Sequence, residues 1–111
     1  MFCFADQLAL QDLGHGIKLR VLGAAENLNV LHWNLDDKAV IDTHHHPQEQ
    51  FGYLISGGFE VTIGDQTATL KAGDSYFIPP NIPHRFVAIG ETEAIDVFSP
   101  KRELTYQPIA K

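Results

Sequence analysis

Cysteine, basic residues and long apolar runs are all scarce in this sequence. Cys3 is the only cysteine among 111 residues, which excludes an internal disulfide and is compatible with a reducing compartment. The 8 lysines and arginines are outnumbered by 14 acidic residues, and this net charge of -6 disfavours a broad nucleic-acid-binding surface. No apolar run approaches membrane-span length, and the N-terminus lacks the basic segment of a signal peptide. We therefore predict a cytoplasmic protein that binds neither nucleic acid nor membrane.

Helical periodicity is also missing, because no long segment repeats apolar side chains every three or four positions. Short runs alternate apolar and polar residues instead, as in FGYLIS, FEVTIG, HRFVAI and EAIDVFS. Turn-forming residues separate them, among them the pair Gly57-Gly58, and only RELTYQ near the C-terminus could form one helical turn. The chain is too short for a second core. These features predict one all-β domain over residues 1–111, folded as a sandwich or barrel.

Three consecutive histidines form the first candidate site. On an extended strand His44 and His46 point to one side and His45 to the other, because successive side chains alternate between faces. Two imidazoles that share a face can bind one transition-metal ion, and residues 48–50 offer oxygen ligands just beyond. A polar loop with incidental histidines is the alternative, and this stretch alone does not exclude it.

A second segment changes this interpretation. The sequence GDSYFIPPNIPHRF begins at Gly73 and places His84 after a proline-rich turn. The first segment has the spacing H-x-H-x3-Q-x6-G, and the second has G-x5-P-x-N-x2-H. Together they resemble the two motifs of the cupin superfamily, at about residues 44–57 and 73–88. The resemblance implies a single-domain cupin β-barrel, that is, a double-stranded β-helix or jelly roll, with one divalent transition metal ion.

Residue by residue, the resemblance gives the metal ligands His44, His46, Gln50 and His84. Three positions depart from the superfamily pattern. Gln50 stands where glutamate is usual, Asn81 replaces a glycine, and Ala88 replaces the final asparagine. Asn81 still tolerates a left-handed backbone, so the turn before His84 is expected to survive.

Gln50 alters the chemistry expected at the site. An amide oxygen is neutral, so a divalent ion keeps its full charge and is a stronger Lewis acid and a better anchor for an anion. An amide also cannot serve as the carboxylate base expected in cupin oxygenases and decarboxylases. Glu49 is the alternative ligand, although the spacing to Gly57 favours Gln50. These donors suit Zn, Ni, Mn, Fe or Cu and do not distinguish between them.

The third informative segment is AIDVFSPKREL, residues 94–104. On a strand Asp96 and Phe98 share a face, and Arg102 follows after a Ser-Pro dipeptide. An edge strand with both charged residues on the surface is the alternative. Together with the two motifs, this segment resembles the KdgF family of pectin and alginate degradation, small cupins with Asp-x-Phe-x3-Arg in the pocket. The resemblance implies that Asp96, Phe98 and Arg102, in a pocket segment over 96–102, act on the substrate.

That family opens 4,5-unsaturated monouronates to linear 4-deoxy-5-keto uronates, so the resemblance implies a small anionic, carboxylated sugar as substrate. Arg102 suits bidentate recognition of a carboxylate. Asp96 is the candidate general acid or base, and Phe98 is an apolar wall that helps to desolvate it. Small cupins are commonly dimers, so we also expect a homodimer. A non-catalytic cupin that binds a small anion and, third, a metal-dependent dioxygenase are the alternative functions.

Most of the larger aromatic side chains are predicted to fill the barrel or to form an interface. They are Trp33, Phe51, Tyr53, Tyr76, Phe77 and Phe86. Two of them, Tyr53 and Tyr76, are also candidates for lining the cavity.

Overall fold

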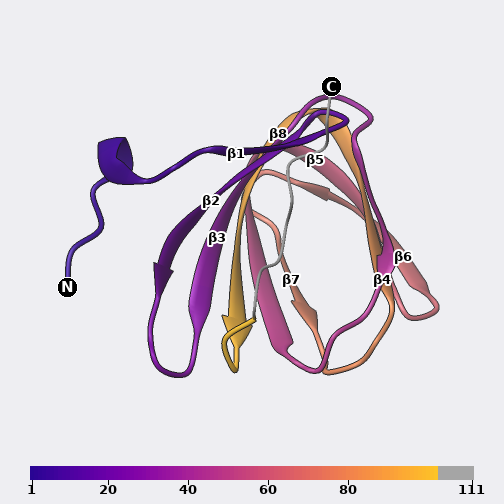
Figure 1. The fold of residues 1–111 in the computed structure, drawn as a ribbon. Coiled ribbons are helices and arrows are strands. Elements are labelled where there is room, and N and C mark those ends of the chain that lie inside the picture. The colour runs from indigo at the N-terminus through magenta and orange to yellow at the C-terminus, as the bar shows by residue number, and fades with distance from the viewer. Residues whose placement is uncertain (103–111) are drawn as a thin grey trace.

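The structure is a computed structural model that describes residues 1–102, and it consists almost entirely of antiparallel strands (Figure 1). A short 3-10 helix precedes eight strands. The elements are η1 (Ala5–Gln7), β1 (Gln11–Gly14), β2 (Ile17–Ala24), β3 (Asn29–Leu35), β4 (Val40–His44), β5 (Glu49–Ile63), β6 (Gln66–Lys71), β7 (Ser75–Ile78) and β8 (His84–Ser99). No helix in the described range is long and apolar enough to cross a membrane. The predicted all-β barrel is confirmed, and the turn suggested at RELTYQ lies outside the described residues, apart from its first one.

Two long strands, β5 and β8, pair with each other along almost their whole lengths and contribute to both faces of the barrel. The first part of β5 also pairs with β7, and its last part with β6. The beginning of β8 pairs with β4, and its end with β3. One face therefore has the order β1-β2-β3-β8-β5-β7, and the other has the order β4-β8-β5-β6. Figure 1 shows these strands curving around a common interior.

The bend between the two faces corrects one sequence-based prediction. FGYLIS and FEVTIG are predicted as two strands separated at Gly57-Gly58, and HRFVAI and EAIDVFS as two more, but each pair forms one continuous strand. The register between β5 and β8 shifts on either side of Ser56. Gly57 and Gly90 have positive φ values of 79° and 73°, and a Cβ at Gly57 would lie 2.2 Å from the carbonyl oxygen of Glu91. The motif glycine therefore bends a strand instead of ending it, because only glycine fits this backbone.

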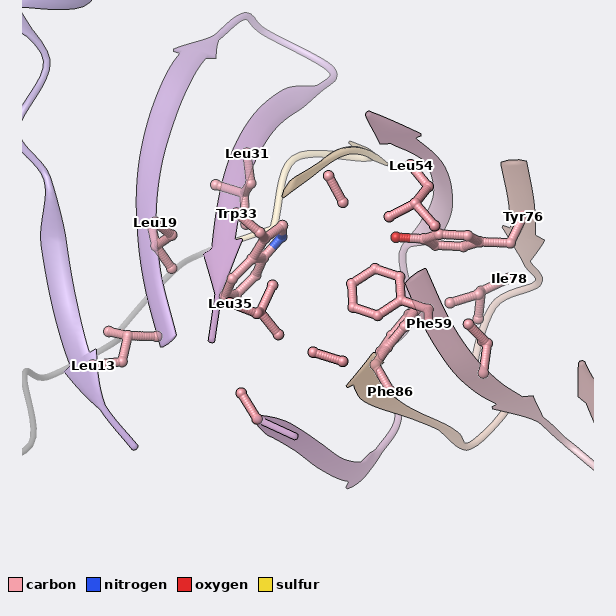
Figure 2. Close-up of a cluster of buried hydrophobic side chains, with 14 of the residues drawn as sticks. Leu13, Leu19, Leu31, Trp33, Leu35, Leu54, Phe59, Tyr76, Ile78 and Phe86 are labelled. Carbon is pink, nitrogen blue, oxygen red and sulfur yellow. The ribbon is translucent and has the colours of Figure 1, made fainter. Parts of the chain in front are cut away.

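Alternation along the strands fills the interior with apolar side chains. Every second residue of β3 is buried, and the same pattern continues along the second half of β8. Figure 2 shows the resulting cluster, with Trp33, Tyr76 and Phe86 among its members, as predicted for barrel-filling aromatics. Phe51 and Phe77 are instead exposed on the outside of the barrel. Buried polar residues also lie inside the barrel, and they include most of the predicted site.

Candidate metal centre and pocket

Three strands bring the predicted ligands to one place. His44 is the last residue of β4 and His84 the first of β8, and these two residues are directly paired. His46 follows in the short connection to β5, where Gln50 is the second residue. The turn before His84 contains Asn81 with φ of 64°, so the predicted left-handed backbone is confirmed.

The three histidine rings form a compact cluster. One ring nitrogen from each of His44, His46 and His84 lies within 4.8 Å of the other two. The His84 ring centroid is 4.3 Å from that of His44 and 4.9 Å from that of His46. His46 and His84 are buried and His44 is half-buried, whereas His45 is exposed, as the alternation predicts.

Backbone carbonyl groups fix the orientation of each ring. Nδ1 of each ring lies near the carbonyl oxygen of a residue two positions away, at 2.8 Å for His44 and His84 and 3.1 Å for His46. A neutral imidazole has one ring proton, so an Nδ1–H that donates to a carbonyl leaves Nε2 as a lone-pair donor. Histidines that bind metals are usually held in this way.

The ring nitrogens that are not bound to backbone carbonyl groups lie close together and carry lone pairs. Nε2 of His46 lies 3.1 Å from Oε1 of Gln50, and Nε2 of His84 is buried without a hydrogen-bond partner in residues 1–102. A cation satisfies such atoms, and three imidazoles with one amide oxygen are a suitable donor set for a first-row transition metal. Gln50 is buried whereas Glu49 is exposed, so the geometry favours Gln50 over the alternative ligand. The residues present therefore fit a metal ion.

Electrostatics keep the cluster in the form that binds metal. Burial lowers the pKa of His44 and His46 and lowers that of His84 to about 4, against the opposing effect of the backbone hydrogen bonds. The positive charge of Arg102 lowers all three pKa values further. At neutral pH the rings are therefore uncharged, and a metal ion does not have to displace protons from them.

The predicted substrate residues line the same pocket as the metal cluster. Asp96, Phe98 and Arg102 share this cavity with His44 and Gln50. The other lining residues are Trp33, Ile41, Phe59, Tyr76 and Phe86. The end of β8 is paired on both sides, with β3 and β5, and Asp96 is only 4% exposed, so the alternative of a surface edge strand is wrong.

Asp96 belongs to a buried polar network. The hydroxyl group of Tyr76 donates to Oδ1 of Asp96 at 2.6 Å, and the Gln50 side chain also donates to this carboxylate. Burial raises the pKa of Asp96 to about 6, and the hydrogen bonds from Tyr76 and Gln50 limit this rise. A buried carboxyl group with a pKa near neutrality can exchange a proton with a bound molecule.

Arg102 is held in place by a contact that the sequence did not reveal. Its guanidinium Cζ lies 5.3 Å from the centroid of the Phe98 ring. The backbone N–H of Arg102 donates to Oδ1 of Asn29, and Nδ2 of Asn29 donates to the carbonyl oxygen of Arg102, both at 3.0 Å. Asn29 is buried and is paired with Phe98 across β3 and β8. Asn29 lies on the face of β3 that is otherwise apolar, and this polar residue within the alternating pattern is the sequence signal that could have indicated its role.

Removal of one histidine should abolish stabilisation by metal. We expect excess Zn²⁺ to raise the thermal unfolding temperature of the wild-type protein, because ligand at a hundredfold excess over Kd stabilises by about 2.7 kcal/mol. His46→Ala should lose this response, and His45→Ala should keep it because that side chain is exposed. Calorimetry with Zn²⁺ and with a chelator measures the difference. An unchanged response in His46→Ala would place the metal elsewhere.

Comparison with known proteins agrees with this architecture. Residues 31–98 match the family model described as cupin domain. Over 99 residues the chain is 33% identical to the pectin degradation protein KdgF of Dickeya dadantii (strain 3937), covering 87% of this chain and 90% of that protein. An RmlC-like cupin from Shewanella frigidimarina superposes with a TM-score of 0.88 at 35% identity, over 92% of each chain. KdgF from Halomonas sp. superposes with a TM-score of 0.87 at 30% identity, over 93% of this chain and 96% of that one. The chain therefore belongs to the cupin family.

Proposed function

We propose that the protein is a metal-dependent enzyme that opens 4,5-unsaturated uronate monomers to linear 4-deoxy-5-keto uronates. The observation that carries this proposal is that His44, a member of the histidine cluster, lines one pocket together with Asp96 and Arg102. Similarity to two KdgF proteins, one of them named for pectin degradation, supports an acidic sugar as the substrate class.

The metal ion would be held by His44, His46, Gln50 and His84, and Zn, Ni, Mn, Fe and Cu all suit these donors. When bound, the ion supplies a positive charge that anchors and polarises an oxygen atom of the substrate. Because Gln50 is neutral, none of that charge is cancelled by the protein ligands.

Recognition of the sugar carboxylate is assigned to Arg102. Its planar guanidinium group can donate two parallel hydrogen bonds to a carboxylate, and it reaches into the pocket above the Phe98 ring. The two hydrogen bonds between Asn29 and the Arg102 backbone hold this residue, so its guanidinium group is positioned before the substrate arrives. A local positive charge of this kind is needed because the chain as a whole has a net charge of -6.

Proton transfer is assigned to Asp96. Opening of the ring turns an enol ether with an anomeric hydroxyl group into a keto-aldehyde, so one proton leaves that hydroxyl group and another is added to a ring carbon. Asp96 is the buried carboxyl group that lines the pocket beside Gln50. The Phe98 ring excludes water on one side, since its centroid lies 5.5 Å from that of His46 and its side chain is fully buried.

Substitutions in the pocket should remove catalysis even when the protein is fully loaded with metal. Metal-loaded protein is mixed with 4,5-unsaturated galacturonate, and loss of the conjugated double bond is followed against the spontaneous reaction. Arg102→Met should raise KM, because the carboxylate loses its partner, whereas Lys101→Met, an exposed neighbour, should change neither constant. Asp96→Ala should lower kcat by about a hundredfold or more, the usual contribution of general acid–base catalysis.

Two results would contradict this function in different ways. Full turnover by metal-loaded Asp96→Ala would remove Asp96 from the mechanism. No acceleration by the fully loaded wild-type protein would exclude this substrate, and oxygen uptake would then test the dioxygenase alternative.

We also propose that the protein is a homodimer. Three aromatic side chains are about half exposed on the outer face of β5 and β7, namely Phe51 (52%), Tyr53 (48%) and Phe77 (49%), and the first and last of these are cross-strand partners. The segment before β1 extends away from the barrel (Figure 1) and exposes Phe2 and Phe4. Exposed aromatic groups of this kind are typical of interfaces, and a two-fold pair is the commonest soluble assembly.

A charge on this outer face should separate the two copies. Phe51→Glu is expected to shift the mass measured by light scattering from two chains to one, because the carboxylate would be buried without a partner. Leu28→Glu is the matched control, since Leu28 is 40% exposed in the turn between β2 and β3. A wild-type protein with the mass of one chain would exclude the dimer, and an unchanged dimer in Phe51→Glu would exclude this face.

A further inference from the structure

Three paired residues cross the wall of the barrel beside the histidine cluster. Tyr76 of β7 is opposite Gly52 of β5, and Gly52 is opposite Asp96 of β8. A Cβ atom at Gly52 would lie 2.0 Å from Cζ of Tyr76 and 2.3 Å from its hydroxyl oxygen. The Tyr76 ring therefore lies directly over the bare backbone of Gly52, with its hydroxyl group pointing into the interior (Figure 2). Glycine at this position is what allows the hydroxyl group to reach Asp96, at 2.6 Å.

Asp96 in turn contacts the amide group of Gln50. Gln50 is two residues before Gly52 on β5, so its side chain lies on the same interior face. Its side chain hydrogen-bonds to the Asp96 carboxylate. Because Oε1 faces Nε2 of His46 at 3.1 Å, the amide nitrogen is the end that is left to donate to the carboxylate. If the amide were rotated by half a turn, its oxygen would face the oxygens of the ionised carboxylate, and neither group could donate a hydrogen bond to the other. The contact with Asp96 therefore decides which end of the amide faces the histidines.

We propose that Tyr76 and Asp96 are positioning residues that fix the amide of Gln50 with its oxygen toward the metal ion, and that Gly52 provides the space they need. The inference rests on the metal centre of the proposed function but not on the sugar substrate. An amide has two ends of similar size, and only its oxygen is a ligand. Without the carboxylate, part of the protein would present nitrogen and lose the fourth ligand. Groups that orient a metal ligand typically contribute about 10- to 100-fold in metal affinity.

Co²⁺ affinity, measured by calorimetric titration of the metal-free protein without sugar, tests this arrangement. Tyr76→Phe removes one oxygen atom and keeps the ring over Gly52. We expect Co²⁺ binding to weaken about tenfold, and the visible absorption of the bound ion to change with its ligands. Tyr53→Phe makes the same chemical change at an exposed position of β5 and should keep the wild-type affinity and spectrum.

The Gln50→Ala background separates positioning from general loosening of the barrel. Gln50→Ala should itself weaken Co²⁺ binding, and adding Tyr76→Phe should then weaken it no further, because the amide that Tyr76 acts on is gone. Equal weakening by Tyr76→Phe in both backgrounds would overturn the proposal. Wild-type Co²⁺ affinity in Gln50→Ala or in Tyr76→Phe would also overturn it.

Gly52→Ala should disturb the same contact between Tyr76 and Asp96. The added methyl group must displace the Tyr76 ring, so this variant should weaken Co²⁺ binding as Tyr76→Phe does, and again only when Gln50 is present. If either variant lacks a cooperative thermal transition, Asp96→Ala replaces it with the same expectation and the same contradicting result. Since no sugar is present, failure of the uronate reaction would leave these affinities unchanged, and the two proposals can fail separately.

Discussion

β5 and β8 pair along almost their whole lengths, and this one register decides which side chains enter the pocket. It places Gln50 opposite Phe98, Gly52 opposite Asp96, and Ile63 opposite His84. Because side chains alternate, a slip of one residue would turn Asp96 and Phe98 out of the barrel. The bends at Gly57 and Gly90 allow β5 and β8 to form part of both faces of the barrel. The ladder of backbone hydrogen bonds therefore positions Gln50, His84, Asp96 and Phe98, whereas His46 and Arg102 lie just outside the strands.

The pocket buries nitrogen and oxygen atoms whose lone pairs are not satisfied by hydrogen-bond donors, which is unusual in a protein interior. Nε2 of His84 is buried without a partner in the described chain, and Nε2 of His46 faces the oxygen of Gln50. Burying such groups is unfavourable unless a cation compensates them. The same burial lowers the pKa of the histidines and raises that of Asp96. In the proposed function, these buried polar groups would provide the metal site and the exchangeable proton.

Local rules predicted the parts of the site that lie within single strands or follow the motif spacing. Alternation placed His45 outside and put Asp96 and Phe98 on one face, and the turn at Asn81 has the expected backbone. That this face is the inner one was indicated only by the family resemblance. Arg102 follows the strand end, so only the family resemblance indicated its place in the pocket.

Contacts between distant strands were not predictable from one sequence. Asn29 meets Arg102 across 73 positions, and Tyr76 reaches Asp96 only because of the register over Gly52. Gly57-Gly58 was expected to end a strand, because a glycine pair looks the same whether it forms a turn or a bulge. The cytoplasmic location and the absence of nucleic-acid and membrane partners stay predictions.

The most direct test of the account is anomalous diffraction from a crystal grown with Zn²⁺. The account predicts one strong peak at about 2.0–2.2 Å from Nε2 of His44, His46 and His84 and from Oε1 of Gln50. A peak bound by Glu49 in place of Gln50, or a histidine cluster that stays empty at saturating Zn²⁺, would contradict it.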